Sequence, residues 1–517
     1  MKVSSHNKNE SEQLKVYTTT EIVGVVSKIR ENGKTIALCH GVFDLLHPGH
    51  FQHFKEASNL ADFLIVSITA DAFVNKGPGR PLFNQEIRAE TLSSLEMIDY
   101  VIISEQATAE KIINLIKPDY YVKGSDYSSP EDDVTGMIIK ERTAIENYGG
   151  ILYFTGGITS SSSSLINKFY SLIDSQTQNW LNMFKETNGY ESVLDSLEKI
   201  SNLNVLILGE TIIDQYTFCT PLAKSSKDPI LAFHQHETNY FPGGVLAIAN
   251  SSSGWALKTK VITFSGLNDQ ILRAFGNKIN SKIDCEYIIA NDRPTILKHR
   301  YVDAASSTRV FEYYNFSELQ LSTQVSNKII SSISTQIGNF DLVIAADYGH
   351  GYFSKSIISL IEEKSSFLAI NTQANAGNRG FNTIAKYSKV DLISINGAEL
   401  QLELRDRNPD YIHIVPKIIQ EKNASHAVVT LGGEGLLVFD DKGNFEKVPA
   451  FATKIVDKVG AGDSVFVIAS LLARVNAPLK VIGFLANLVA AHEVSQLGHQ
   501  RSLERSDLLK HAKSILK

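Results

Sequence analysis

The sequence has few cysteines, no long apolar run and no block of positive charge, and each absence narrows what the protein can be. Its 517 residues include three cysteines, Cys39, Cys219 and Cys285, whose odd number and wide spacing argue against a disulfide framework or a CxxC metal site. No stretch of about 18 apolar residues occurs, and the polar leader MKVSSHNKNESEQLK lacks the apolar segment of a secretory signal. We therefore expect a cytoplasmic protein without a membrane span.

Composition and charge narrow the partner class further. The net charge of −6 comes without a long basic run, so nucleic acid is not an expected partner, whereas small anionic ligands need only local positive charge. A hydrophobic content of 43% over this length predicts two or three domains, each with its own core.

The first third of the chain predicts a doubly wound α/β domain. After a polar leader at residues 1–17 that we expect to be disordered, short apolar strands such as TIALCHG, DFLIVSIT and ILYFTG alternate with helical stretches over residues 18–170. Such alternation predicts a Rossmann-like, mostly parallel sheet with helices on both faces.

The remainder predicts a helical connector and a second α/β domain. Residues 171–202 show apolar side chains at helical spacing without a strand signal. From residue 203 to 517 strand and helix signals alternate again, and the segments PILAFHQHE and TRVFEYY add a strand-rich insertion. We expect a large α/β domain carrying a small β lid.

The stretch CHGVFDLLHPGH carries the first chemical signal. It places a glycine turn after a strand and then His47, Pro48, Gly49 and His50 at the start of a helix. Proline suits the first helical position, and the free backbone N–H groups there favour an anion. The two imidazoles could donate to charge that develops on an α-phosphate during in-line displacement, although histidines that simply begin a helix are the plainer alternative.

This stretch resembles the GxFDxxHxGH motif of the nucleotidyltransferase superfamily. Together with GRPLFNQEIR and VKGSDY, it is similar to the adenylyltransferase half of the bifunctional heptose-phosphate kinase and adenylyltransferase enzymes of lipopolysaccharide synthesis, over about residues 20–170. The resemblance implies that His47 and His50 stabilise the transition state. It also implies a nucleotide-binding set made of Gly41, Phe43, Gly49, Lys76, Arg80, Arg88, Lys123, Gly124 and Asp126.

The run of five serines at 160–164 reads first as a flexible tether. It follows the strand ILYFTG and precedes a helical pattern, so its hydroxyls are predicted at a helix N-terminus, as caps or as phosphate ligands. The resembled adenylyltransferases imply nucleotide contacts for Ser161, Ser162 and Ser163.

The stretch DKVGAGDSVFVIASLLA carries the second signal. Gly460, Ala461 and Gly462 precede a very apolar helix and can expose backbone N–H groups to an anion, while Asp463 is placed to take a proton from an attacking hydroxyl. With TLGGEG, NGAE and PGG in this order, the chain resembles the ribokinase and PfkB family of sugar kinases over about residues 203–500.

That resemblance implies three sets of residues in the second domain. The nucleotide set is Asn396, Thr430, Gly432, Gly435, Gly460, Ala461, Gly462 and Asn487. The sugar set is Asp214, Gly243, Gly244, Lys298, Arg300 and Arg309. Glu399 is implied to bind magnesium through water, which makes Mg²⁺ and ATP the expected cofactor and co-substrate.

Several positions depart from the resembled heptose kinases. Ala247 stands where GGAAN has its asparagine, His350 interrupts the DYxKG pattern, and Gln373 ends a segment that reads Asp-Pro-Lys in those kinases. Val459 replaces the threonine before GAGD, and the kinase half follows the nucleotidyltransferase half instead of preceding it. The departures weaken the substrate assignment and leave the base and the anion hole in place.

These motifs predict a bifunctional enzyme that makes a nucleotide-activated sugar for a surface polysaccharide. One half would phosphorylate a sugar phosphate similar to heptose 7-phosphate, and the other would transfer a nucleotidyl group from ATP to a sugar 1-phosphate. The alternative is an active nucleotidyltransferase, using ATP, CTP or GTP, beside a kinase-like domain that only binds sugar or forms a dimer. The sequence leaves open the sugar, the nucleotide base preference and the oligomeric state. A homodimer is compatible with it.

Overall fold

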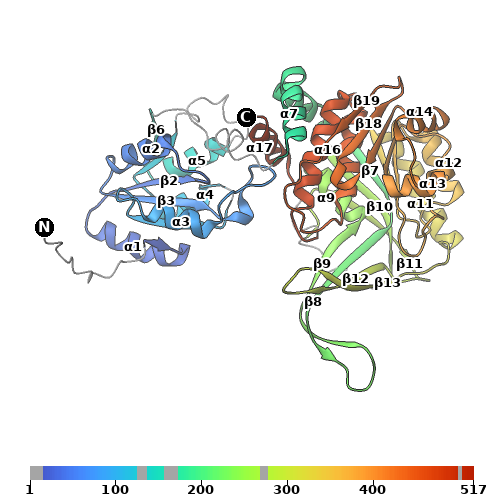
Figure 1. Ribbon diagram of the computed structural model, residues 1–517, viewed down its shortest axis with the longest axis horizontal. Helices are drawn as coiled ribbons and strands as arrows, with labels where there is room; N and C mark the ends of the chain where they lie inside the picture. Colours follow the sequence, from blue (N-terminus) through green and yellow to red (C-terminus); the bar gives the residue numbers. More distant parts are fainter. Residues whose placement is uncertain (1–14, 107, 125–136, 157–172, 268–277, 499–502) are drawn as a thin grey trace. The chain divides into compact units, whose positions relative to one another are not determined.

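The computed structural model describes residues 15–106, 108–124, 137–156, 173–267, 278–498 and 503–517 (Figure 1). The chain forms two compact units. The N-terminal unit comprises the chain up to residue 172 together with Leu509–Ile515 and Lys517, and the C-terminal unit comprises residues 173–508 and Leu516. None of the helices in these ranges combines the length and apolarity needed to cross a membrane.

The N-terminal unit is built on a parallel sheet in the order β1-β4-β3-β2-β5-β6. Its strands are β1 (Val16–Tyr17), β2 (Ile36–Gly41), β3 (Phe63–Thr69), β4 (Tyr100–Ser104), β5 (Tyr120–Gly124) and β6 (Ile151–Thr155). Because β1 pairs with β4, the prediction of a disordered leader is wrong for Val16 and Tyr17. Its helices are α1 (Thr19–Glu31), α2 (Pro48–Ser58), η1 (Asp71–Phe73), α3 (Gln85–Ser93), α4 (Glu110–Ile116) and α5 (Met137–Glu146).

Alternation along β2 shows why this sheet needs helices on both faces. Ile36 and Leu38 belong to one apolar cluster, whereas Ala37 and Cys39 belong to another on the opposite face. All four are fully buried, which is typical of a parallel strand covered on both sides. The loop after β2 therefore leaves the sheet where the strand order reverses between β3 and β5, the usual position of a ligand site.

The C-terminal unit has a nine-stranded sheet in the order β11-β10-β7-β14-β15-β16-β17-β18-β19, in which β18 runs antiparallel to its neighbours β17 and β19 and the other pairs are parallel. These strands are β7 (Asn204–Gly209), β10 (Lys258–Gly266), β11 (Ile283–Ala290), β14 (Leu342–Asp347), β15 (Leu368–Thr372), β16 (Leu392–Asn396), β17 (His426–Thr430), β18 (Leu436–Asp440) and β19 (Phe445–Val448).

Helices cover this sheet on both faces. They are α7 (Ser175–Thr187), α8 (Gly189–Ile200), α9 (Val245–Ser253), α11 (Thr323–Gln336), η3 (Ile337–Asn339), α12 (Lys355–Lys364), η4 (Ile384–Lys386), α13 (Gly397–Leu404), α14 (Tyr411–Lys422), η5 (Gly432–Glu434), α15 (Ala461–Arg474) and α16 (Leu479–Glu493). Helix α17 (Arg505–Ile515) follows, and its residues from Leu509 onward are grouped with the N-terminal unit.

A separate four-stranded sheet forms the predicted lid. Its order is β13-β12-β8-β9, from strands β8 (Thr211–Lys224), β9 (Leu231–Gly244), β12 (Ile296–Asp303) and β13 (Arg309–Asn315). Figure 1 shows the β8–β9 hairpin running on beyond the other lid strands. The predicted fold class, a Rossmann-like α/β domain followed by a larger α/β domain with a β lid, is confirmed.

The segment predicted as a connector is helical but belongs to the C-terminal unit. Phe184 of α7 is fully buried and its ring stacks on Phe484 of α16 at 4.5 Å between centroids. The indole Nε1 of Trp180 donates to Glu446 Oε1 at 2.8 Å. The apolar face that indicated a helix therefore packs into the core of this unit, so α7 and α8 are not a free tether.

Candidate functional sites

The first candidate site lies at the N-terminus of α2. His47 is the N-cap in extended conformation, Pro48 is the first helical residue, and the rings of His47 and His50 stack at 3.9 Å between centroids. The side chain of His47 makes no capping hydrogen bond. The structure thus brings both predicted histidines and Gly49 to one helix start beside the loop after β2.

Burial fixes the charge state of His50. Burial lowers its pKa to about 3, and His47 and Lys76 push the pKa in the same direction. Its buried Nδ1 has no hydrogen-bond partner among the described residues. His50 is therefore neutral near pH 7 and available to donate to an incoming phosphate oxygen rather than to a resident carboxylate.

Gly41 and Phe43 shape the wall beside these histidines. Phe43 has a positive φ of 48°, and its ring lies 5.4 Å from His50 and 5.0 Å from Phe54 between centroids. A Cβ at Gly41 would meet the Phe43 ring at 3.0 Å. The Phe43 ring thus packs the loop after β2 against α2, and the contact with Gly41 fixes the conformation of this loop.

Three predicted phosphate-binding cations differ in their surroundings. Arg80 pairs with buried Asp44 at 3.0 Å. Arg88 is 2% exposed and pairs with Asp71 at 2.6 Å, while its other donors reach the carbonyls of Val42, Thr69 and Phe83. These contacts favour a role for Arg88 in holding the site's loops instead of the predicted contact with phosphate.

Burial lowers the pKa of Lys76 as well as that of Arg80. Burial lowers the pKa of Lys76 to about 8, partly opposed by Asp44. Its charge is therefore retained near pH 7 but is poorly solvated, so an anionic ligand would stabilise it.

The other predicted N-terminal residues lie at the carboxyl end of β5 or outside the described ranges. Lys123 pairs with Glu141 at 2.9 Å, and Tyr121 donates to the same carboxylate at 3.0 Å. Gly124 is the last residue of β5. Asp126, Ser161, Ser162 and Ser163 fall outside the residues that the structure describes.

The second candidate site gathers the ends of consecutive strands in the C-terminal unit. Strands β14, β15, β16 and β17 end at Asp347, Thr372, Asn396 and Thr430. Because neighbouring parallel strands end at one edge of a sheet, the loops that follow them share that edge.

Asp463 lies in the first turn of α15, after the predicted anion hole. Gly460 is the N-cap of this helix with φ 84°, followed by Ala461 and Gly462. The amide of Gln373 donates from Nε2 to Asp463 Oδ1 at 2.5 Å. The residue that departs from the resembled kinases thus contacts the predicted base, and its neutral amide orients the carboxylate without neutralising it.

Glu399 contacts Ala374, the residue that follows Gln373. Its Oε1 accepts from Ala374 N at 3.0 Å and its Oε2 accepts from Asn396 N at 3.0 Å. Burial raises the pKa of Glu399, and the charge of Asp463 raises it further. The negative charges of Glu399 and Asp463 therefore repel each other, and a divalent cation would reduce this repulsion.

The donor set at Glu399 fits magnesium bound through water. Part of the carboxylate's capacity is used by two backbone amides, and its remaining lone pairs can accept from the water ligands that Mg²⁺ retains. Within the described ranges no three His, Cys, Asp or Glu side chains converge as a metal site. A single carboxylate beside substrate phosphates is the usual arrangement for Mg²⁺.

The remaining predicted nucleotide residues fall into two groups. Asn396 caps α13 and its Nδ2 donates to Thr430 Oγ1 at 3.4 Å, while Gly432 begins the short helix η5. A Cβ at Gly435 would collide with the carbonyl of Val448, so only glycine fits.

Asn487 is buried within α16, where its Nδ2 donates to the carbonyl of Val448 at 3.4 Å. This bond joins α16 to the end of β19, and the implied nucleotide contact of Asn487 stays a prediction.

The predicted sugar residues meet at the lid. Asp214 on β8 pairs with Arg300 on β12, and Arg300 also pairs with Glu312 at 3.3 Å. A Cβ at Gly243 would collide with Asp214 Oδ2, so glycine lets this carboxylate lie directly against the backbone. Gly244, with φ 56°, caps α9.

Lys298 and Arg309 differ in what they face. Burial lowers the pKa of Lys298, opposed by the charge of Asp214, and its Nζ lies 5.7 Å from the ring centroids of Tyr314 and Tyr348. Arg309 pairs with buried Asp457, six residues before Asp463. Lys298 is thus placed between the sugar residues and the base, whereas Arg309 braces the segment that leads to the anion hole.

Glu210 is a structural residue that sequence reasoning missed. It is fully buried and its carboxylate accepts from the amides of Tyr348, His350 and Tyr352, at 3.2, 3.0 and 3.3 Å. Burial raises the pKa of Glu210 to about 7, with a further contribution from Asp347. A charged residue inside the apolar strand-to-lid stretch GETIID was the available signal.

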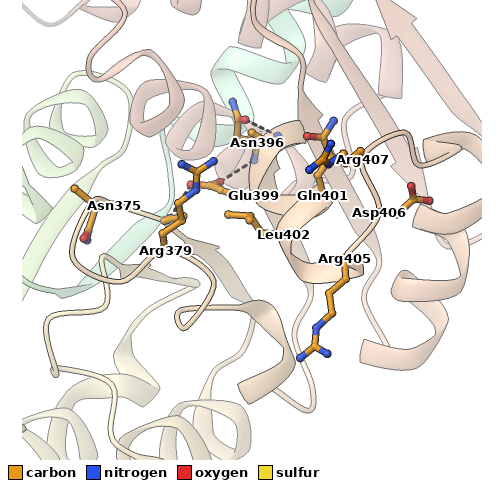
Figure 2. A pocket seen from close by; sticks show the side chains of 12 residues that line it. Asn375, Arg379, Asn396, Glu399, Gln401, Leu402, Arg405, Asp406 and Arg407 are labelled. Carbon is orange, nitrogen blue, oxygen red and sulfur yellow. Dashed lines mark hydrogen bonds between the residues drawn. The ribbon is translucent and has the colours of Figure 1, made fainter.

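A cavity of about 920 Å³ opens beside Asn396 and Glu399 (Figure 2). Its lining includes three arginines that sequence reasoning missed, Arg379, Arg405 and Arg407. The charged stretch ELRDRNP was a signal for Arg405 and Arg407, and the turn-like stretch GNRG was a signal for Arg379. The full lining is Ala374, Asn375, Ala376, Arg379, Asn396, Ala398, Glu399, Gln401, Leu402, Arg405, Asp406 and Arg407.

Comparison with known families matches each unit to a different model. Residues 202–506 match the model described as pfkB family carbohydrate kinase. Residues 38–168 match the model described as cytidylyltransferase-like.

Curated relatives match over a short part of their length. A bifunctional protein HldE of Aliarcobacter butzleri is 39% identical over 147 residues, which is 28% of this chain and 30% of that protein. The HldE protein of Nitratiruptor sp. is 43% identical over 114 residues, 22% of this chain and 25% of that protein. The chain thus spans less than a third of the length of these two relatives.

Solved structures support the fold of the larger unit. The phosphofructokinase-2 of Escherichia coli, in a complex with potassium, superposes with a TM-score of 0.50 and 16% identity. The alignment covers 61% of this chain and all of that chain. At this identity the likeness is one of fold.

Proposed function

This chain belongs to the pfkB family of carbohydrate kinases, and from that premise we propose that it has two activities that together activate a sugar. The C-terminal unit transfers the γ-phosphate of MgATP to a sugar phosphate similar to heptose 7-phosphate. The N-terminal unit transfers a nucleotidyl group to a sugar 1-phosphate and releases pyrophosphate. The observation that carries the proposal is the convergence of Asp463, Glu399 and the Asp214–Arg300 pair in one unit and of His47 and His50 in the other.

In the C-terminal unit Asp463 accepts the proton of the sugar hydroxyl as that oxygen attacks phosphorus. Gln373 holds the carboxylate, and the backbone amides of Gly460 to Gly462 face the phosphate that is transferred. Magnesium, when bound with ATP, neutralises phosphate charge, and Glu399 holds its water ligands. Asp214 and Lys298 orient the sugar and its phosphate.

In the N-terminal unit the acceptor is already an anionic phosphate and needs no base. His47 and His50 donate to the α-phosphate as pyrophosphate leaves, and Lys76 binds the phosphate chain. We propose ATP as the nucleotide, with CTP as the direct competitor because the matching family model is described as cytidylyltransferase-like.

One contact favours a second candidate function for the C-terminal unit. Gln373 occupies one oxygen of Asp463 at 2.5 Å, and Ala247 and His350 also depart from the resembled kinases. Under this reading the unit binds sugar, or pairs two chains in a homodimer, without transferring phosphate.

The decisive experiment supplies the full chain with MgATP and a panel of sugar phosphates that includes heptose 7-phosphates and heptose 1-phosphates. ADP formation reports the C-terminal unit and pyrophosphate formation reports the N-terminal unit, while mass spectrometry identifies each product. Repeating the second assay with CTP and GTP assigns the base. Pyrophosphate without ADP across the panel would leave the second candidate in place of the kinase.

A further inference from the structure

Three arginines line the cavity beside Asn396 and Glu399. Arg379 lies in the loop after β15, Arg405 caps the C-terminus of α13, and Arg407 follows two residues later. Within the ranges that the structure describes, none of the three forms an ion pair with a carboxylate. A guanidinium group that has no carboxylate partner and points toward the polar residues of a ligand-sized cavity is suited to bind a phosphate-bearing ligand.

The three side chains point in different directions. Figure 2 shows Arg379 reaching toward Glu399 and Asn396, Arg407 lying beside Gln401, and Arg405 extending away from the group. Arg379 is therefore the arginine placed to act together with Glu399 on a ligand, and Arg405 is a natural control of the same chemistry.

The loop that carries Arg379 is held in place by asparagine side chains. Asn375 and Asn378 donate from Nδ2 to the carbonyl of Tyr348, at 2.9 and 2.8 Å, and Asn382 donates to the carbonyl of Asp347 at 2.8 Å. Ala374 in the same loop donates to Glu399. A cation on a loop tied at four points is presented to its ligand with little further ordering cost.

Two lysines near this site already face carboxylates. Gln373, which contacts Asp463, is neutral, and Lys386 pairs with Asp347. Lys298 faces Asp214 and the lid. Transfer of a γ-phosphate gathers negative charge that fixed cations must offset.

We propose that Arg379 binds the β- and γ-phosphates of the nucleotide in the C-terminal unit. This inference rests on the proposed kinase function, because it assigns a phosphate-binding residue to that same site. The planar guanidinium donates two parallel hydrogen bonds to phosphate oxygens in a fixed fork, whereas a lysine is a point charge at the end of a flexible stem.

The test compares Arg379→Ala, Arg379→Lys and Arg405→Ala in the full chain, with MgATP and heptose 7-phosphate. Loss of a charge-assisted contact predicts an increase of about 10- to 100-fold in the KM for MgATP in Arg379→Ala. We expect a partial effect in Arg379→Lys and values within about twofold of wild type in Arg405→Ala. Pyrophosphate formation by the N-terminal unit, assayed separately with heptose 1-phosphate as the acceptor, should stay constant in all three variants and reports that the chain is intact.

A binding measurement separates this inference from the kinase proposal. Hydrogen exchange with a non-hydrolysable ATP analogue and Mg²⁺ should protect residues 396–407 in wild type and in Arg405→Ala, but not in Arg379→Ala. If the analogue protects these residues in wild type but not in Arg379→Ala, and no ADP forms, the kinase proposal is refuted and the nucleotide site is supported. Equal protection in both alanine variants, equal KM values, or no protection in wild type would overturn the assignment of Arg379.

Discussion

The candidate sites of the two units both lie at a glycine-containing helix N-terminus, but the side chains around these two helix ends have opposite chemistry. At α2 the neighbours are imidazoles, and burial keeps His50 uncharged. At α15 the neighbours are the carboxylates Asp463 and Glu399, with Arg379 close by. The difference follows from the acceptors we propose: a phosphate nucleophile arrives deprotonated, whereas a hydroxyl must lose a proton to a base.

The substitution with the largest expected effect tests the predicted base of the C-terminal unit. Asp463→Asn removes the base while keeping the shape that Gln373 contacts, and loss of general base catalysis predicts a fall of about 10²- to 10⁴-fold in the kcat for ADP formation. Pyrophosphate formation should not change. Asp441→Asn, at an exposed turn of the same unit, is the matched control and should behave as wild type. Equal ADP formation in both variants would remove Asp463 from the mechanism.

The reciprocal change tests the imidazoles. His50→Ala removes a donor to the α-phosphate, and the loss of one such donor predicts a fall of about 10²- to 10³-fold in the kcat for pyrophosphate formation. ADP formation should be unaffected. Gln52→Ala, on the exposed side of the same helix, controls for changes in α2. If His50→Ala and Gln52→Ala retain equal activity, His50 is only a packing residue.

Much of the fold was predictable because strand and helix periods were clear in both units. The loop after β2 and the helix at Ala461 could be placed from glycine, proline and apolar runs alone. The helices α7 and α8 were predicted, but their attachment was not, because the partner of Phe184 is Phe484, 300 positions away (484 − 184). Local patterns show that a face is apolar without showing what covers it.

The sites were less predictable wherever a side chain's role depends on distant partners. Arg88 and Arg379 are both arginines near glycine-rich turns, yet one is consumed by Asp71 and backbone carbonyls and the other lines a cavity. Glu210 gains its role from the amides of a loop about 140 positions later. These roles depend on contacts between residues far apart in the chain, which local sequence patterns do not reveal.

A substitution with a smaller expected effect tests the predicted sugar site. Gly243→Ala places a Cβ against Asp214 Oδ2 and forces this carboxylate away from its position. We expect the KM for the sugar phosphate to rise about 10-fold, in line with the cost of about 1–3 kcal/mol for overpacking a tight site. Gly338→Ala, where a Cβ would meet nothing within 4 Å, is the control. The only two tryptophans, Trp180 and Trp255, lie in this unit, so their fluorescence reports whether it remains folded.

The smallest expected effect is a difference in how stability depends on pH. Burial lowers the pKa of His50 to about 3, so between pH 6.5 and 3 the unfolded N-terminal unit binds more protons, and its stability falls as the pH falls. Burial raises the pKa of Glu210 to about 7, so between pH 4.5 and 7 the folded C-terminal unit binds more protons, and this group's contribution falls as the pH rises.

The two substitutions should therefore shift the pH dependence in opposite directions between pH 5 and 6.5. Compared with wild type, His50→Gln should reduce the rise of N-terminal stability with pH, and Glu210→Gln should make the stability of the C-terminal unit rise more with pH. Each change is at most about 1.4 kcal/mol per pH unit. Hydrogen exchange measures the N-terminal unit and tryptophan fluorescence the C-terminal unit. Shifts of the same sign in both would mean that the neutral imidazole and the protonated carboxyl do not distinguish the two units.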